Sequence, residues 1–389
     1  MDEVWGEAER QGREFCSGRR DEMKYFIFLR KKIIRMKRSL IYRCERYGYV
    51  DNTGEFVIKP QFEEADNFSE GLASVKINGE YGYIDRFGSL VIEPQFFMAG
   101  YFNEGLAVVE DGGPTYLIDR FGNLVFQLDP YYGPKYVTGF CEGLLCVINY
   151  HVKGGLGVYG YMDRTGAFVI EPKFDDASNF LDGLALVKIN GKYGYINKFG
   201  DFVVEPKFDY AEDFFAGLAV VGNNQKFGYI DRKGNYVVEP KFTRANVFSE
   251  GLASVEINNQ WGFIDRNGNF IIEPKFESAL CSRFSDGLAV VLDNDEQQLI
   301  DREGNFVVLQ KFDDIDSFGF HKGLIRIKVN GKWGFMDSMG NFVIEPKYDK
   351  IENFSDGLAV VQDTYEKHLD LDNTPLDMQE LIHFLEKIN

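Results

Sequence analysis

Residues 256–276 read EINNQWGFIDRNGNFIIEPKF, and related copies of this stretch recur from Tyr47 to Tyr348. A Gly-Leu dipeptide marks nine copies at separations of 34 to 40 residues, beginning at Gly71, Gly105, Gly143, Gly183, Gly217, Gly251, Gly287, Gly323 and Gly357. A proline recurs at one repeat position, at Pro60, Pro94, Pro172, Pro206, Pro240, Pro274 and Pro346. Because repeats pack mainly on their neighbours, a chain of 389 residues can form one repeat domain.

The first part of each copy predicts a hairpin. Leu184–Ile189 is an apolar strand-like run, and Lys192–Asn197 is a second one. Between them lies Asn190-Gly191, a strong hairpin signal because both residues of that turn take positive φ. The sequence therefore predicts two paired strands in this half of the repeat.

The second part predicts a turn and a third strand. Residues 265–268, Asp-Arg-Asn-Gly, fit a type I turn followed by a left-handed glycine, and Asn269–Glu273 then forms the strand. Pro274 has no N–H to donate, so the strand ends there or lies at a sheet edge. The remaining segment, as in Lys173–Asp182, is expected to wrap between units as a loop.

These residues resemble a known family. Lys332–Asp337 reads KWGFMD, and Gly340 and Glu345–Tyr348 follow it. This pattern resembles the WG-repeat family of bacterial proteins, also called KWG repeats, over about residues 46 to 360. The resemblance implies a β-rich repeat array that works in protein interaction.

Two units lack the motif at the same two places. The third and eighth units have Thr115-Tyr116 and Gln297-Gln298 where the others have aromatic-Gly. They have Gln127-Leu128 and Leu309-Gln310 where the others have Glu-Pro or Lys-Pro. This double loss predicts contact between the two motif parts. We expect the Trp261 ring to pack on Pro274 across paired strands while Gly262 leaves room.

We expect an all-β fold, an elongated solenoid of about nine WG-type β-meander repeats over residues 46–372, with helical caps at 1–45 and 373–389. Met23–Arg43 carries eight basic and no acidic residues, which predicts an amphipathic helix. That helix either caps the first repeat or docks on a membrane surface or a partner. Thr374-Pro375 begins the C-terminal cap. A closed β-propeller is the alternative fold.

Composition narrows the cellular setting. The net charge of −18 argues against a nucleic-acid partner, because Lys and Arg supply most of the affinity for phosphates. Five cysteines lie out of repeat register, which favours a reducing compartment. No run of eighteen apolar residues and no cleavage pattern of a secretory signal is present. We therefore expect a cytoplasmic protein.

The sequence shows no catalytic constellation. An aspartate recurs in the predicted turns, at Asp51, Asp85, Asp119, Asp163, Asp231, Asp265, Asp301 and Asp337. These carboxylates are expected to close turns rather than bind calcium, which needs several carboxylates within one short loop. The four histidines have no metal-ligand spacing. We expect no enzyme activity, no cofactor and no metal.

Two Tyr-rich insertions, residues 129–136 and 150–155, interrupt the period. They are either loops of a decayed repeat or a binding surface, since insertions in repeat proteins map to loops. The candidate interaction residues are Tyr131, Tyr132, Tyr136, Tyr150 and His151. We expect a non-catalytic scaffold for protein–protein interaction. The alternative is a carbohydrate or cell-envelope binding module that uses the repeated aromatic rings, although such rings also serve as core.

Overall fold

The computed structural model describes residues 40–135, 139–151, 157–279, 283–307, 311–316 and 319–369, without the side chains of 40–44 and 364–369. The chain divides into two compact units. One unit is Arg46–Asp363, and the other combines Met1–Glu45 with Thr364–Asn389.

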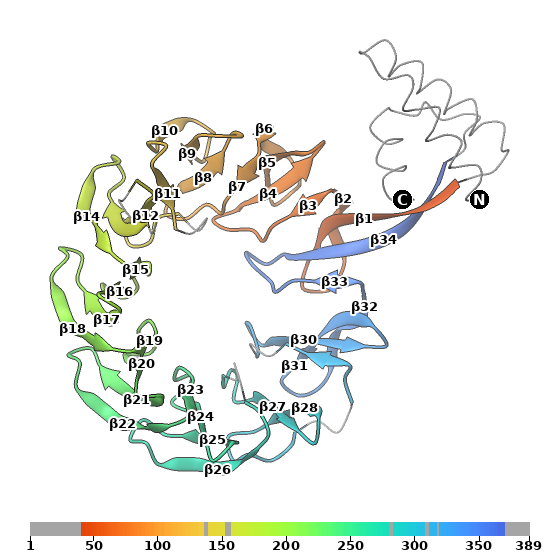
Figure 1. The fold of residues 1–389 in the computed structure, drawn as a ribbon. Coiled ribbons are helices and arrows are strands. Elements are labelled where there is room, and N and C mark those ends of the chain that lie inside the picture. The colour runs from red at the N-terminus through yellow and green to blue at the C-terminus, as the bar shows by residue number, and fades with distance from the viewer. Residues whose placement is uncertain are drawn as a thin grey trace, which may run out of the picture. The chain divides into compact units, whose positions relative to one another are not determined.

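The described part of the unit Arg46–Asp363 contains nine sheets that follow one another around a ring (Figure 1). Eight sheets have four strands and one has two. In each four-stranded sheet a short strand of two or three residues lies nearest the centre of the ring. We call the sheets blades. The architecture is that of a β-propeller.

The strands of blades 1 to 3 are as follows. Blade 1 has β3 (Glu64–Ala65), β4 (Leu72–Ile77), β5 (Glu80–Asp85) and β6 (Leu90–Phe96). Blade 2 has β7 (Met98–Ala99), β8 (Leu106–Glu110), β9 (Thr115–Asp119) and β10 (Leu124–Gln127). Blade 3 has β11 (Tyr132–Pro134), β12 (Leu145–Asn149), β13 (Val158–Met162) and β14 (Phe168–Phe174).

Blades 4 to 6 follow the repeat most regularly. Blade 4 has β15 (Asp176–Ala177), β16 (Ala185–Ile189), β17 (Lys192–Ile196) and β18 (Phe202–Phe208). Blade 5 has β19 (Tyr210–Ala211), β20 (Leu218–Asn223), β21 (Lys226–Asp231) and β22 (Tyr236–Phe242). Blade 6 has β23 (Arg244–Ala245), β24 (Ala253–Ile257), β25 (Gln260–Ile264) and β26 (Phe270–Phe276).

The last three blades complete the ring. Blade 7 has β27 (Ala289–Asp293) and β28 (Glu296–Ile300). Blade 8 has β29 (Asp314–Ile315), β30 (Leu324–Val329), β31 (Lys332–Asp337) and β32 (Phe342–Tyr348). Blade 9 has β33 (Lys350–Ile351), β34 (Ala359–Leu369), β1 (Leu40–Val50) and β2 (Phe56–Phe62).

The eight four-stranded blades contain one strand more than the three per repeat that we expected from the sequence. The predicted hairpin and third strand are present, but the segment interpreted as a loop contains the innermost strand. In blade 4 this strand is β15, whose two residues pair with Lys188 and Val187 of β16. A two-residue strand shows no alternation of polar and apolar residues, so the sequence pattern does not reveal it.

The hydrophobic core lies between neighbouring blades. One cluster joins Trp261 and Phe263 of blade 6 to Ala289 and Val291 of blade 7. Because each blade is covered on both faces, its second strand can be apolar at consecutive positions. In blade 2, all four residues of Leu106–Val109 are apolar and buried. The repeated apolar residues are therefore explained by packing between blades.

The ring closes through blade 9, which takes two strands from each end of the repeat array. Its order is β2-β1-β34-β33, so the first repeat supplies the outer pair and the last repeat supplies the inner pair (Figure 1). Side-chain hydrogen bonds between described residues span this closure. They include Ser355 Oγ to Phe68 O at 2.6 Å, Tyr348 Oη to Gly54 O at 2.8 Å, Lys347 Nζ to Gly54 O at 3.2 Å, and Gly71 N to Asp356 Oδ2 at 2.8 Å.

The elongated solenoid expected from the sequence is therefore wrong, and the closed propeller is the fold. Pairing the first repeat with the last removes the two open ends of the array, so capping helices have no end to cover. The predicted N-terminal helical cap is also wrong over residues 40–45, which belong to β1. The rest of the two expected helical segments, residues 1–39 and 373–389, lies outside the described residues.

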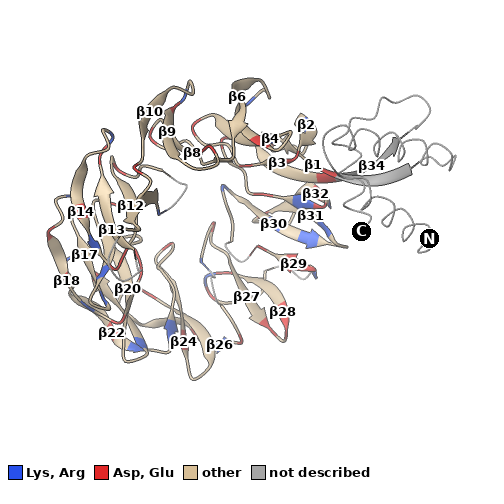
Figure 2. Ribbon diagram, turned by 45° about the horizontal axis from the view of Figure 1, so that its top comes forward, with Lys and Arg blue, Asp and Glu red and all other residues tan. Residues whose placement is uncertain are grey.

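No helix occurs in the described residues, and accordingly none that is long and apolar enough to span a membrane. Figure 2 shows acidic and basic residues distributed over many blades of the ring. The excess of negative charge is therefore not confined to one blade.

Candidate functional site

The repeated aspartates close turns. In blade 6, Asp265 Oδ1 accepts the N–H groups of Asn267 and Asn269, both at 2.9 Å. The hydrogen bond from the Asn269 N–H and its neighbours lower the pKa of Asp265. Asn197 fills the same position in blade 4 and accepts the equivalent bonds. Among the described residues no group of three or more His, Cys, Asp or Glu could hold a metal ion.

The glycine of the WG motif faces the backbone of the outermost strand. A Cβ on Gly262 would lie 2.5 Å from Ile272 O and 2.7 Å from Pro274 N. The strand pairing places Trp261 opposite Phe276 and Phe263 opposite Ile272, so β26 bulges beside Gly262. The predicted contact thus joins glycine to the proline-bearing backbone, whereas the tryptophan is paired with Phe276.

The same close approach occurs in seven blades, between the pairs Gly48 and Pro60, Gly82 and Pro94, Gly160 and Pro172, Gly194 and Pro206, Gly228 and Pro240, Gly262 and Pro274, and Gly334 and Pro346. In blade 2, Tyr116 pairs directly with Gln127 and there is no bulge at this position. This explains why the third unit lacks both residues. In the eighth unit, Leu309-Gln310 lies outside the described residues.

The repeated aromatic rings belong mainly to the walls between blades. Trp261 is only 2% exposed, and Tyr229 is fully buried. The Tyr229 hydroxyl donates to Asn246 O of the next blade at 2.7 Å. Tyr193 is half-buried, and Lys188 Nζ lies 4.9 Å from its ring centroid. These contacts confirm the interpretation of these rings as core.

The structure brings three of the five predicted interaction residues together beside blade 3. Tyr131 and Tyr150 are 52% and 62% exposed, and His151 is also exposed. The rings of Tyr131 and His151 lie 4.4 Å apart, and Tyr150 N donates to Tyr131 O at 2.9 Å. Tyr132 is half-buried within the blade, and Tyr136 lies outside the described residues. We call Tyr131, Tyr150 and His151 the insertion cluster.

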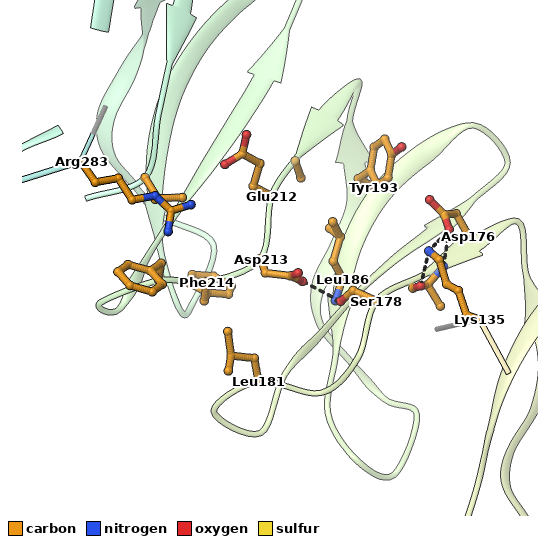
Figure 3. Close-up of a pocket in the computed structure, with 14 residues that line it drawn as sticks. Lys135, Asp176, Ser178, Leu181, Leu186, Tyr193, Glu212, Asp213, Phe214 and Arg283 are labelled. Carbon is orange, nitrogen blue, oxygen red and sulfur yellow. Dashed lines mark hydrogen bonds and ion pairs between the residues drawn. The ribbon is translucent and has the colours of Figure 1, made fainter. Parts of the chain in front are cut away.

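A recess of about 420 Å³ lies at the inner ends of the blades, and sequence reasoning missed it (Figure 3). Most of its lining follows the innermost strands β11, β15 and β19, and β17 and the segment before blade 7 add to it. Its charged and aromatic lining consists of Lys135, Asp176, Tyr193, Glu212, Asp213, Phe214, Phe215 and Arg283.

One side of the recess is held by an ion pair between blades. Lys135 Nζ donates to Ala177 O at 2.6 Å and forms an ion pair with Asp176 (Figure 3). Lys135 comes from the insertion after blade 2, and Asp176 comes from β15 of blade 4. The charge of this lysine is therefore already compensated within the protein.

The middle of the recess carries a carboxylate. Ser178 Oγ donates to Asp213 Oδ1 at 2.6 Å and accepts the Leu186 N–H at 3.0 Å. Partial loss of water raises the pKa of Asp213, an effect that the Ser178 hydrogen bond opposes. Asp213 forms no ion pair with any residue that the structure describes.

The far side of the recess carries Arg283. Its guanidinium lies over the Phe215 ring, 5.4 Å from the ring centroid. Within the described ranges Arg283 forms no ion pair. The recess therefore presents unpaired groups of both signs.

The available sequence signal was one variable repeat position. The residue after each innermost strand is Asp66, Gly100, Lys135, Ser178, Glu212 or Asn246 in blades 1 to 6. Variation at one position of an otherwise regular repeat marks side chains that packing does not fix. The sequence could not show that these residues share a recess, because Lys135 and Arg283 lie far apart in the chain and come together only in the folded ring.

Comparison with solved structures gives only remote likenesses. A structure titled as the eukaryotic initiation factor is 13% identical with a TM-score of 0.36, over 70% of this chain and 96% of that chain. Kluyveromyces lactis Hsv2 is 10% identical with a TM-score of 0.35, over 67% and 95%. The extracellular domain of a putative hybrid two component system from B. thetaiotaomicron is 11% identical with a TM-score of 0.29, over 82% and 55%. At such TM-scores we draw no conclusion from these likenesses.

A comparison with curated proteins finds no match. The family model described as WG containing repeat matches eight segments, residues 47–81, 81–113, 159–193, 193–227, 227–261, 261–296, 299–333 and 333–364. The unmatched stretch between residues 113 and 159 contains both insertions. The matches confirm the resemblance seen in the sequence and cover most of the ring, so the chain belongs to the WG containing repeat family.

Proposed function

We propose that this chain is a non-catalytic binding module whose recess takes one small polar molecule. The ring of WG repeats is a repeat-based interaction module. The observation that supports a small ligand is the recess itself, whose volume of about 420 Å³ falls within the range typical of small-molecule sites.

The lining of the recess supports binding rather than catalysis. Neither histidine nor cysteine is among its lining residues. The hydroxyl of the lining serine, Ser178, is held between the Leu186 N–H and the Asp213 carboxylate. A site of this kind is nearer to the binding-module alternative considered from the sequence than to a broad protein scaffold.

The proposal is tested by filling the recess. Leu181→Trp adds bulk at a lining residue without changing charge, and Leu124→Trp is the control because Leu124 is exposed on the outermost strand of blade 2. The full chain and both variants are screened by ligand-observed NMR against amino acids, sugars and nucleosides. We expect a compound that binds the parent and Leu124→Trp but not Leu181→Trp. No compound bound, or equal binding by all three proteins, contradicts the proposal.

The insertion cluster supports a second candidate function, docking of a protein partner. Its exposed tyrosines combine a large ring with a polar tip, as is common at interfaces. Deleting residues 129–155 would remove β11 and β12, so point variants are the better test. Tyr131→Ser with Tyr150→Ser should abolish capture of any partner that the parent chain retains. Tyr236→Ser, on the outer strand of blade 5, is the control.

A further inference from the structure

The recess has more charge available to a ligand than the ion pair at its edge suggests. Lys135 and Asp176 compensate each other. Asp213 and Glu212 accept hydrogen bonds from the neutral groups of Ser178 and Tyr210, at 2.6 Å each. Neither carboxylate forms an ion pair with a described residue, although the nearby charge of Lys135 favours the ionised form of Asp213. Two carboxylates in the wall of the recess can therefore pair with a cationic group of a ligand.

Arg283 is the opposite charge. Its guanidinium is stacked on Phe215 and keeps its N–H donors free of any carboxylate in the described chain. A guanidinium presents a planar fork that matches a carboxylate in two parallel hydrogen bonds. Arg283 is exposed at the recess, so its guanidinium can pair with an anionic group of a ligand.

The aromatic rings of the recess are less available to a ligand than its charged groups, because cations already lie over their faces. Arg283 covers one face of Phe215, Lys188 lies over Tyr193, and Arg232 lies over Phe214. Phe214 is also buried. A sugar that stacks on a ring face would compete with these cations, so the rings do not favour a neutral carbohydrate.

The remaining lining is apolar. Leu181, Leu186 and Val247 line the recess together with Ala177 and Ala211. Apolar surface of this kind gains from covering a hydrocarbon side chain. The ligand that uses all of these features therefore has an ammonium group, a carboxylate and an apolar part.

We infer that the recess binds a small zwitterion of the α-amino acid class, with its ammonium group at Asp213 and Glu212 and its carboxylate at Arg283. This inference rests on the proposed function of the recess and names the ligand class. An anion without an ammonium group would meet two unpaired carboxylates, and a cation without a carboxylate would leave Arg283 unpaired. Both are disfavoured relative to the zwitterion.

The test uses the full chain and isothermal titration calorimetry with four probes. L-leucine is the zwitterion, N-acetyl-leucine lacks the ammonium group, leucine methyl ester lacks the carboxylate, and glucose is the neutral polyol. Asp213 and Arg283 are exposed, so each end of the ligand would be held by a charge-assisted hydrogen-bonded pair at the rim of the recess. Loss of one such pair should weaken binding about tenfold, so leucine should bind about tenfold tighter than either blocked form.

Variants assign the two ends of the ligand. Asp213→Asn should weaken leucine and its ester but change N-acetyl-leucine little, and Arg283→Gln should weaken leucine and N-acetyl-leucine but change the ester little. A purely structural effect would weaken all probes alike. Glu80→Gln and Lys233→Gln are charge-matched controls, since both residues are exposed and lie outside the recess.

The outcomes separate the inference from the proposed function. Equal binding of leucine and a blocked form overturns the inference. Binding of glucose without leucine overturns it too but leaves a binding recess in place. If neither these probes nor the compounds of the wider screen bind, the proposed function falls together with the inference.

Discussion

The glycine of the WG motif is required for space rather than for an unusual backbone angle. Any side chain at Gly262 would meet backbone atoms of β26, which cannot move away as the end of a flexible side chain can. Gly113 is a useful contrast, because a Cβ there meets nothing within 4 Å. The two positions therefore separate a steric requirement from the general effect of replacing a glycine.

Gly262→Ala should lower the free energy of unfolding by about 1–3 kcal/mol, the usual cost of overpacking a fixed site. Gly113→Ala should change it by less than about 0.5 kcal/mol. Urea unfolding of the two variants and the parent measures both. Equal stability of Gly262→Ala and the parent would show that the bulge tolerates a side chain.

The turn aspartates predict an acid dependence of stability. Hydrogen bonds lower the pKa of Asp265 in the folded protein, so its contribution is present above the unfolded pKa of about 3.9 and is lost as pH falls through the lower folded pKa. Asp265→Asn should keep the turn, as Asn197 does, and remove this dependence. Asp265→Ala should lose about 1 kcal/mol at neutral pH.

Thermal unfolding of both variants at neutral pH and at roughly pH 3 is the measurement, because the unfolded carboxyl is largely protonated there. The stability difference between the parent and Asp265→Asn should shift in favour of the variant on acidification. A difference that does not change with pH would contradict the role of the ionised carboxylate.

The roles of residues that contact only their neighbours in the sequence were predictable. Asp265 and Gly268 form their turn from neighbouring atoms alone, so the spacing was enough. A contact between the two motif parts was predictable, because two units lose both parts together. That Gly262 rather than Trp261 lies against Pro274 was not predictable, because the pairing of Trp261 with Phe276 depends on a bulge. Asp213 and Arg283 carried no local signal, since nothing nearby in sequence links them.

Strands from neighbouring blades are joined by a repeated hydrogen bond. A buried tyrosine of the third strand donates to a carbonyl of the next blade in five copies, Tyr49, Tyr83, Tyr161, Tyr195 and Tyr229. Burial raises the pKa of Tyr229 well above its ordinary value, so the hydroxyl stays protonated and remains a hydrogen-bond donor. Blade 6 has Phe263 at this position, which has no hydroxyl group and cannot form the bond.

Tyr229→Phe should lower the free energy of unfolding by about 0.5–1.5 kcal/mol, because Asn246 O loses its donor while the ring is kept. Tyr131→Phe should have an effect below about 0.5 kcal/mol, since Tyr131 is exposed. Urea unfolding compares the two variants. Equal effects would show that the hydroxyl of Tyr229 does not join the blades.

The sequence predicts the longer strands well and misses the shortest ones. Hairpins such as β16 and β17 have apolar runs and an Asn-Gly turn, and the sequence placed them within one residue at each end. Innermost strands such as β15 have only two residues and are held by β16. The recess lies beside these short strands, so the error in the strands and the missed site have one cause.

The ring depends on contacts that no single repeat contains. Each unit meets its neighbours alike whether the array is open or closed, so the repeat pattern predicts the blade but leaves the closure undetermined. Closure requires the blade-to-blade rotation to return the first repeat to the last. It occurs through β1 and β34, whose residues lie at opposite ends of the repeat array.

A distance across the closure tests the central claim most directly. Thr53 and Met339 occupy equivalent turn positions in blades 9 and 8, and Lys233 and Asn267 occupy the same positions in blades 5 and 6. All four are exposed and accept spin labels without disturbing the core. Pulsed electron–electron double resonance on the full chain should give the same distance between labels for both pairs if the ring is closed. A distance between labels at 53 and 339 far longer than that between 233 and 267 would show an open array and contradict the propeller.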